Sequence, residues 1–220
     1  MKGPLFYSKI LLFGEYGIIQ DSKGLSIPYN FYNGALKKED HPSQDAIASN
    51  GHLKRFVTYL ESLQTEQPDL VQFDIATLQK DVNEGMYFDS SIPQGYGVGS
   101  SGALVAAIYD KYAQHKITVL ENLTREKLLE LKTIFSQMES FFHGKSSGLD
   151  PLNSYLSIPI LINSKDNIEA TGIPTQSFDG KGAVFLLDSG IVGETAPMVN
   201  IFMENLKDQG FRTMLKSQFV

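Results

Sequence analysis

Apolar residues along the first 90 positions follow two different periods. From Leu5 to Phe13 they are dense and interrupted only by short polar steps, which predicts a strand. From Ile47 to Leu63 they recur at near-helical spacing between charged side chains, which predicts an amphipathic helix. After Pro68, alternation of apolar and polar residues from Leu70 to Ala76 predicts a half-buried strand, and Met86 to Ser90 is a further strand candidate.

The rest of the chain mixes helices with extended segments. Two long helices are predicted, one from Ser101 to His115 and one from Thr124, which forms a weak capping pattern with Lys127, to Phe142. Turn-forming residues then accumulate from Ser164 to Gly182, which marks a boundary. The other predicted elements are the strands Ile158 to Ile162 and Ala183 to Asp188 and the helix Met198 to Gln209. Because strands and helices do not alternate as regular βαβ units, the predicted fold class is α+β.

The composition excludes several kinds of chemistry. The chain has 220 residues and no cysteine, so it cannot use a disulfide, a thiolate nucleophile or a cysteine-ligated metal. Acidic residues outnumber basic ones by 25 to 19, and no run of lysine or arginine is present to hold nucleic acid. No stretch approaches the roughly 20 apolar residues of a membrane span, and the first residues lack the layout of a signal peptide. We therefore expect a cytoplasmic protein with neither a nucleic acid nor a membrane partner.

The strongest chemical signal is the segment Pro93 to Ala103, PQGYGVGSSGA, which directly precedes an apolar helix. Alternating glycines at Gly95, Gly97 and Gly99 leave backbone N–H groups uncovered, and the helix start adds partial positive charge. Together these features predict an anion site, with triphosphate as its natural occupant. The alternative is a plain glycine-rich turn, although three alternating glycines and two serines exceed what a turn requires.

Three better-known motifs do not fit this sequence. A dinucleotide-binding fingerprint would need a glycine at Ser100, and a serine-hydrolase elbow would need one at Ala103. The tripeptide GKS at 144–146 looks like the end of a P-loop, but Glu139 stands where that loop requires its first glycine.

Three segments in register resemble the GHMP kinases, small-molecule kinases named for galactose, homoserine, mevalonate and phosphomevalonate. Pro93 to Ala103 resembles their glycine–serine phosphate loop. KILLFGEYGII at 9–19 resembles the N-terminal motif in its mevalonate kinase version, with a lysine six residues before a glutamate. ESFFHGKSSGLD at 139–150 resembles the segment with a glutamate, a His-Gly pair and Ser-Gly-aliphatic-Asp. The resemblance spans residues 9–153.

The resemblance implies transfer of a phosphoryl group from ATP to the hydroxyl of a small molecule. Asp150 would orient that hydroxyl and accept its proton, and Lys9 would hold Asp150 ionised and stabilise charge on the transferred group. Taken alone, Lys9 could be a surface lysine and Asp150 a helix cap. The residues expected to bind ATP are Pro93, Gly95, Gly97, Val98, Gly99, Ser100, Ser101, Gly102 and Ala103.

The resemblance also implies a set of metal and substrate residues. Glu139 and Ser101 would share one Mg²⁺, although the Ser100 hydroxyl could also reach metal or phosphate. Glu139 precedes Asp150 by 11 positions (150 − 139), the interval expected from mevalonate kinases, whereas Glu139 considered alone would be a solvated helix glutamate. The residues expected near the substrate are Glu15, His143 and Gly148, with an exposed hairpin glutamate as the alternative for Glu15.

The sequence departs from the family pattern in three places. Tyr16 stands where mevalonate kinases usually carry histidine, and Lys145 and Ser146 stand where a small residue and proline are more usual. Nothing after Gly193 resembles the family's C-terminal glycine-rich motif. The implied two-lobed fold therefore has an N-terminal lobe like ribosomal protein S5 domain 2 over residues 1–170 and an incomplete ferredoxin-like lobe over residues 171–220. The chain is expected to be either C-terminally shortened or a compact variant of the family. A shortened chain would expose apolar faces, for which a homodimer is one expected outcome.

The leading hypothesis is a kinase for a small hydroxylated carboxylic acid, with mevalonate as substrate and mevalonate 5-phosphate, for isoprenoid synthesis, as product. Phosphomevalonate or a sugar is the alternative substrate. A second hypothesis is a non-catalytic nucleotide-binding or regulatory module. A third is a structural or protein-binding domain in which the glycine loop has no role.

Overall fold

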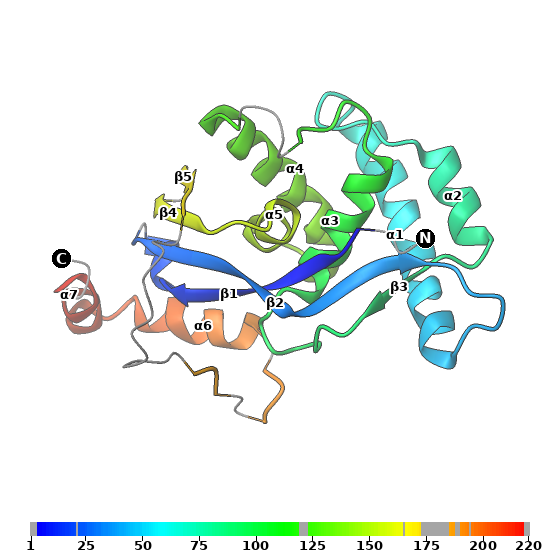
Figure 1. Cartoon of the computed structure of the whole chain (residues 1–220). Coiled ribbons are helices and arrows are strands. Elements are labelled where there is room, and N and C mark those ends of the chain that lie inside the picture. The colour runs from blue at the N-terminus through cyan, green and yellow to red at the C-terminus, as the bar shows by residue number, and fades with distance from the viewer. Residues whose placement is uncertain are drawn as a thin grey trace.

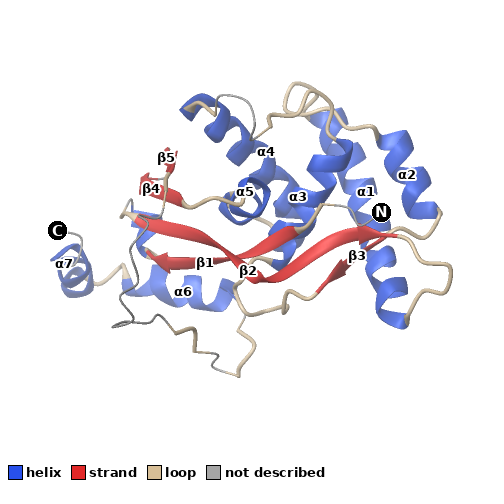
Figure 2. Ribbon diagram, in the orientation of Figure 1, coloured by secondary structure: helices blue, strands red, loops and turns tan. Residues whose placement is uncertain are grey.

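The computed structural model describes residues 4–20, 22–118, 123–164, 166–172, 185–187, 190–193 and 195–217. A five-stranded antiparallel sheet and a group of helices form the main body, so the predicted α+β class is confirmed (Figures 1 and 2). The strands are β1 (Phe6–Phe13), β2 (Gly24–Lys37), β3 (Tyr87–Ser90), β4 (Ile160–Ser164) and β5 (Asn167–Ala170). The helices are η1 (Gly17–Gln20, a 3₁₀ helix), α1 (Gln44–Glu66), α2 (Ile75–Asn83), α3 (Ser100–Tyr112), α4 (Arg125–His143), α5 (Leu149–Leu156), α6 (Thr195–Asn205) and α7 (Gln209–Ser217).

The long strand β2 organises the sheet. It pairs with β1 along residues 25–34, with β4 at residues 24–26 and with β3 at residues 34–37. Pro28 lies opposite Lys9 in this register, and the backbone N–H of Lys9 donates to the carbonyl of Val98, 3.0 Å away, instead of to β2. Proline has no backbone N–H to donate. It is tolerated at this position because the pair of Pro28 with Lys9 needs no hydrogen bond from β2 to β1.

Most of the predicted elements are confirmed, with small shifts at their ends. The predicted strands and helices correspond to β1, α1, β3, α3, α4 and β4. The weak capping pattern is also real, because the Thr124 hydroxyl accepts a hydrogen bond from the backbone N–H of Lys127 at the start of α4. For α4, the polar cap at its start and the apolar periodicity along it are therefore two independent sequence signals of the same helix.

The predicted strand from Leu70 to Ala76 is wrong. Its only strand-like contact is an isolated bridge between Phe73 and Ala113, and α2 begins at Ile75. The Asp74 carboxylate accepts a hydrogen bond from the backbone N–H of Thr77, 3.0 Å away, and so caps this helix. The helix cap at Asp74 lies within the alternating run, so the last residues of the run begin a helix and do not form a strand.

The structure describes all of the predicted C-terminal helix but only part of the predicted strand before it. The predicted helix near Met198 to Gln209 corresponds to α6, which ends earlier, at Asn205. The Asp208 carboxylate then accepts a hydrogen bond from the Phe211 N–H at the start of α7. Of the predicted strand from Ala183 to Asp188, residues 183, 184 and 188 lie outside the described residues, and residues 185–187 are not in a strand. Six of the described elements were not predicted: η1, β2, α2, α5, β5 and α7.

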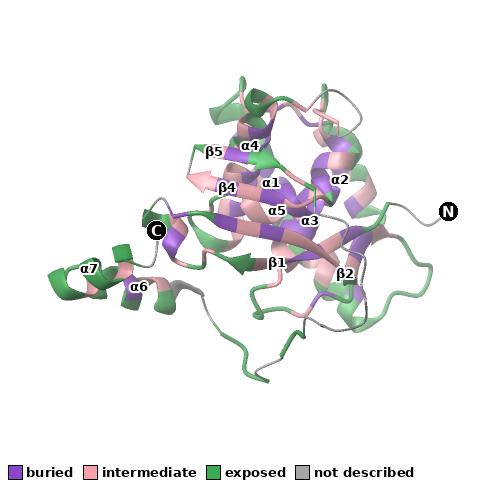
Figure 3. Cartoon of the chain, turned by 60° about the vertical axis from the view of Figure 1, so that its left-hand side comes forward, coloured by how far each residue is buried: buried purple, intermediate pink, exposed green. Residues whose placement is uncertain are grey.

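The core lies between the sheet and the helices α1 to α5, and α6 lies on the other side of β1 (Figure 1). Figure 3 shows burial concentrated in this helical layer and in the middle of the strands, while α6 and α7 are mostly exposed. The largest fully buried side chains include Phe56, Tyr109 and Phe135. Phe202 of α6 is buried and stacks on Tyr16, with ring centroids 5.5 Å apart. This contact fastens α6 to the turn that follows β1.

Candidate active site

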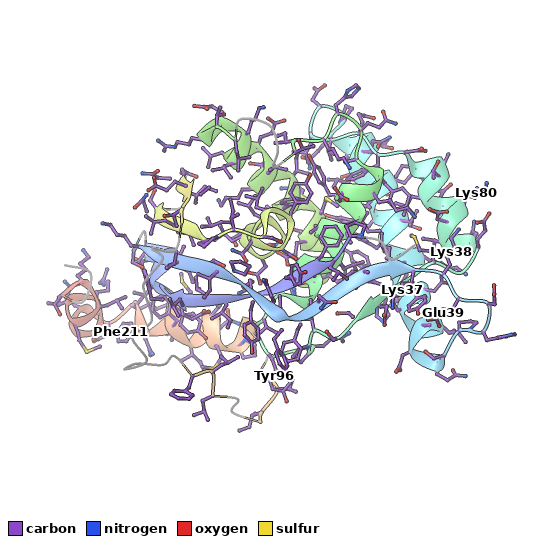
Figure 4. The ribbon with its side chains drawn as sticks, viewed as in Figure 1. Lys37, Lys38, Glu39, Lys80, Tyr96 and Phe211 are labelled. Atoms are coloured by element: carbon purple, nitrogen blue, oxygen red, sulfur yellow. The ribbon has the colours of Figure 1, made fainter. Side chains whose placement is uncertain are left out.

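The glycine-rich segment connects β3 to α3 and has the backbone conformation that its glycines permit. Gly95, Gly97 and Gly99 have φ of +78°, +68° and +83°, which side-chain-bearing residues rarely adopt. Gly99 is the N-cap of α3, so the first turn of that helix opens directly from the loop. Exposed backbone N–H groups beside a helix start form the kind of concave site that binds anions. Figure 4 labels Tyr96 on this loop.

The loop is held against the sheet and against the segment that precedes α6. The carbonyl of Val98 accepts a hydrogen bond from the Lys9 backbone on β1. A Cβ at Gly99 would lie 3.1 Å from Cγ of Lys9. On the other side, Gly193 donates its backbone N–H to the carbonyl of Gly95, at 2.9 Å. The absence of a side chain at Gly99 therefore lets the loop approach the lysine stem closely.

Helix α5 brings Asp150 to the start of α3. A Cβ at Gly102 would lie 2.7 Å from the carbonyl carbon of Asp150 and 2.8 Å from the nitrogen of Pro151. Only glycine allows the two helices to approach this closely. Asp150 lies in the first turn of α5, where the helix dipole favours a negative charge.

Lys9 and Asp150 form an ion pair at the centre of the site, with Nζ 3.0 Å from Oδ1. The Lys9 side chain is 10% exposed and the Asp150 side chain is 35% exposed. The ammonium is therefore largely removed from water, whereas the Asp150 side chain remains partly accessible. A buried cation of this kind requires a close anionic partner.

Glu139 is a second carboxylate, buried on the last turn but one of α4. Its Oε1 accepts a hydrogen bond from the Ser101 hydroxyl at 2.9 Å, and its Oε2 accepts one from the Ser146 hydroxyl. Burial and then the charge of Asp150 raise the pKa of Glu139 to about 7, against the opposing effect of the two serine hydrogen bonds and of Lys9. The site thus contains two interacting carboxylates and one cation.

His143, at the end of α4, contacts the same serine. Its Nε2 lies 3.0 Å from the Ser101 hydroxyl oxygen. The Ser101 hydroxyl donates to Glu139, and which partner donates in its contact with His143 depends on the tautomer of the imidazole ring. Sequence reasoning assigned His143 to the substrate, and the structure places it beside the predicted metal residue Ser101.

Gly148 is the N-cap residue of α5. It has φ of +74°, and a Cβ there would lie 2.1 Å from the carbonyl oxygen of Lys132 on α4. The turn therefore packs directly on the α4 backbone. Gly148 shapes the approach to Asp150 through this packing.

Glu15 lies apart from these residues. It is exposed in the turn after β1, where its carbonyl accepts a hydrogen bond from the N–H of Gly17. The extended strand places Phe13 roughly 13 Å beyond Lys9. The structure therefore brings together Lys9, Ser101, Glu139, His143 and Asp150 around the glycine loop, but it does not bring Glu15 into contact with Lys9 or Asp150.

The donor set fits a magnesium ion held by few protein groups. Within the described residues, no cluster of three or more histidine, aspartate or glutamate side chains could hold a metal by itself. The Glu139 carboxylate and the Ser101 hydroxyl are hard oxygen donors that already lie within hydrogen-bond distance of each other, next to the anion-binding loop. Mg²⁺ is commonly held by one or two protein oxygens together with phosphate oxygens and water.

Sequence reasoning missed one polar residue of this cluster as a functional residue. Ser146 was noted only as a departure from the family pattern, and the structure places its hydroxyl on Glu139. Ser146 lies beyond the end of α4, whose C-cap is Gly144, so helical periodicity does not place it next to Glu139.

Comparison with known proteins gives a family match for part of the chain and similar folds for most of it. Residues 60–157 match the family model described as the GHMP kinases N terminal domain. The fold is similar to that of the Methanococcus jannaschii mevalonate kinase, with a TM-score of 0.54 and 14% identity over 99% of this chain and 70% of that one. It is also similar to L. major mevalonate kinase in complex with R-mevalonate, with a TM-score of 0.50 and 17% identity over 98% of this chain and 68% of that one.

No curated protein matches the chain. Among the described residues, no helix is long and apolar enough to cross a membrane.

Proposed function

We propose that the protein belongs to the GHMP kinases and uses ATP and Mg²⁺ to phosphorylate the hydroxyl group of mevalonate, giving mevalonate 5-phosphate for isoprenoid synthesis. The match of residues 60–157 to the family's N-terminal domain supports this proposal. The observation that carries the proposal is the Lys9–Asp150 ion pair, at 3.0 Å, beside the glycine loop and the start of α3. A cation, a carboxylate and an anion-binding loop at one point are the groups that phosphoryl transfer to an alcohol requires.

Asp150 would position the substrate hydroxyl and take its proton. The hydroxyl oxygen forms a bond to the γ-phosphorus, the bond from that phosphorus to the β–γ bridging oxygen breaks, and ADP leaves. The proton moves to the Asp150 carboxylate late in a loose transition state, so a weakly basic carboxylate is sufficient. The partial exposure of the Asp150 side chain supports this role, since only its Oδ1 is paired with Lys9.

Lys9 would stabilise negative charge on the transferred group. Its ammonium is nearly buried, and attraction between charges is stronger where water is excluded. When bound, Mg²⁺ supplies further neutralisation of the phosphates, and Ser101 and Glu139 are the residues that would hold it. The chain carries a net charge of −6, so an anionic substrate and ATP depend on these local groups for attraction.

The choice of mevalonate follows from the neighbouring folds and the motifs. Both solved structures described above are mevalonate kinases, and one of them was determined with R-mevalonate. The motif with Glu139 eleven positions before Asp150 resembles the mevalonate kinase version of the family pattern. Phosphomevalonate and sugars are the competing substrates within the same reaction class.

A coupled assay of ADP release tests the proposal with mevalonate, phosphomevalonate, homoserine and galactose as acceptors. We expect turnover with mevalonate above that with the other three. Turnover with galactose alone would overturn the mevalonate assignment and keep the kinase. ATP binding by calorimetry without ADP release on any of the four acceptors would instead favour the non-catalytic nucleotide-binding module.

A further inference from the structure

Ser146 lies in the short turn between α4 and α5, and its hydroxyl makes two hydrogen bonds. It accepts one from the backbone N–H of Gly148, 3.0 Å away, and it donates one to Oε2 of Glu139. The backbone N–H can only donate, and with Glu139 ionised the single proton of the hydroxyl points to the carboxylate. The proton of Ser146 is therefore committed to Glu139.

The backbone of Ser146 is fixed as well. Its carbonyl accepts a hydrogen bond from the Ser136 hydroxyl on α4, at 2.6 Å. The turn is bounded by Gly144 and Gly148, which both have positive φ, and Gly148 packs against the backbone of Lys132. The Ser146 hydroxyl is thus held in place from both sides and cannot move away from the carboxylate without breaking these contacts.

This arrangement divides the two oxygens of Glu139 between two tasks. Oε2 is held by Ser146, on the side of the turn. Oε1 faces the Ser101 hydroxyl at the start of α3, beside the glycine loop. A carboxylate with one oxygen tied presents the other in a defined direction, whereas a carboxylate without that tie can rotate about its terminal bond.

We propose that Ser146 is a positioning residue that holds the Glu139 carboxylate so that Oε1 is directed, together with Ser101, toward the magnesium of bound ATP. The inference rests on the proposed function, because it assumes that Glu139 and Ser101 hold Mg²⁺. Ser146 also connects Glu139 to the turn that leads into α5, and therefore couples the metal residue on α4 to the helix that carries Asp150.

The test measures ATP binding by calorimetry, without substrate, at a series of free Mg²⁺ concentrations and in EDTA. In Ser146→Ala, we expect the free Mg²⁺ concentration that gives half of the gain in ATP affinity to rise by about tenfold or more. ATP binding in EDTA should stay as in the wild type. Ser146→Thr keeps the hydroxyl and should restore the wild-type Mg²⁺ dependence.

Ser140→Ala is the matched control. Ser140 is the residue after Glu139, but its hydroxyl donates to the carbonyl of Ser136 and does not contact the carboxylate. This variant should bind ATP and Mg²⁺ as the wild type does. Circular dichroism and thermal melting of all four proteins would show that the variants are folded.

Two outcomes would overturn the inference. The first is an unchanged Mg²⁺ dependence in Ser146→Ala. The second is an equal loss in Ser146→Ala and Ser146→Thr accompanied by weaker ATP binding in EDTA, because that result means collapse of the turn. If Ser146→Ala shifts the Mg²⁺ dependence as expected but the wild type does not phosphorylate mevalonate, the positioning role stands and the substrate assignment fails.

Discussion

Lys9 and Asp150 are 141 positions apart in the sequence (150 − 9), and the Nζ of Lys9 lies 3.0 Å from Oδ1 of Asp150. The first lies on β1 and the second in the opening turn of α5, and the tight approach of α5 to α3 at Gly102 places them together. With its side chain only 10% exposed, Lys9 has lost most of its hydration and relies on this carboxylate.

Asp150→Asn should remove most of the turnover and leave ATP binding in place. The amide is nearly the same size as the carboxylate but cannot accept the proton of the substrate hydroxyl. We expect the rate of ADP release to fall by at least about a hundredfold, with ATP affinity by calorimetry changed far less.

Asp89→Asn provides the control for loss of an ion pair by itself. Asp89 pairs with Lys37, which is labelled in Figure 4, and both side chains are more than 40% exposed. Such a surface pair contributes little to stability, so turnover should remain at the wild-type level. Wild-type turnover in Asp150→Asn would contradict the assignment of Asp150 as the proton acceptor.

The parts of the site that were foreseeable from the sequence are those carried by contiguous motifs. The glycine loop, Lys9, Glu139 and Asp150 each belong to a segment whose residue types have a chemical reason, and the structure brings these residues together. Glu15 belongs to the same kind of segment, yet the extended strand carries it away from Lys9. Motif membership therefore indicates residue type and does not fix the distance between residues.

The elements that were not foreseen depend on contacts between distant segments. The central strand β2 contains Pro28 and Gly34, which reduce strand propensity, and its pairing with β1, β3 and β4 overrides this local preference. Ser146 likewise gains its role only when the turn folds back onto α4. Neither feature has a local period from which it could be derived.

Gly148→Ala should destabilise the protein more than a comparable change at another glycine with positive φ. A Cβ at position 148 would lie 2.1 Å from the Lys132 carbonyl oxygen, so the turn would have to move off α4. We expect the free energy of unfolding in urea to fall by at least about 2 kcal/mol, and turnover to fall as well because Asp150 follows this turn.

Gly85→Ala is the control that measures the effect of a side chain at positive φ on stability, without a close contact. Gly85 has φ of +87° in the turn before β3, and a Cβ there would meet nothing within 4 Å. Its replacement should reduce the free energy of unfolding by about 1 kcal/mol and leave turnover unchanged. Equal losses of stability in the two variants would show that the close contact at Gly148 is not important.

Asp81 on α2 is the centre of a charged cluster with Lys38 and Lys111. Its Oδ1 pairs with Lys38 at 2.9 Å, and its Oδ2 pairs with Lys111 at 2.8 Å and accepts a hydrogen bond from the Tyr112 hydroxyl. Lys38 follows the end of β2, close to Lys80 in Figure 4. Burial opposes ionisation of Asp81, but the hydrogen bonds from Lys111, Tyr112 and Lys38 outweigh it, so the pKa of Asp81 lies below 3.8, its ordinary value.

The lowered pKa makes the contribution of Asp81 to stability dependent on pH. Below the ordinary value the unfolded chain binds a proton at Asp81 more readily than the folded one, so this contribution is complete above about pH 5 and is lost as the pH falls. Asp81→Asn should reduce the free energy of unfolding by about 2 kcal/mol near pH 7, whereas Asp89→Asn should reduce it by less than about 1 kcal/mol. In urea unfolding at several pH values, the difference between wild type and Asp81→Asn should narrow toward about pH 3. A difference that stays constant with pH would mean that Asp81 stabilises the fold through packing and not through its charge.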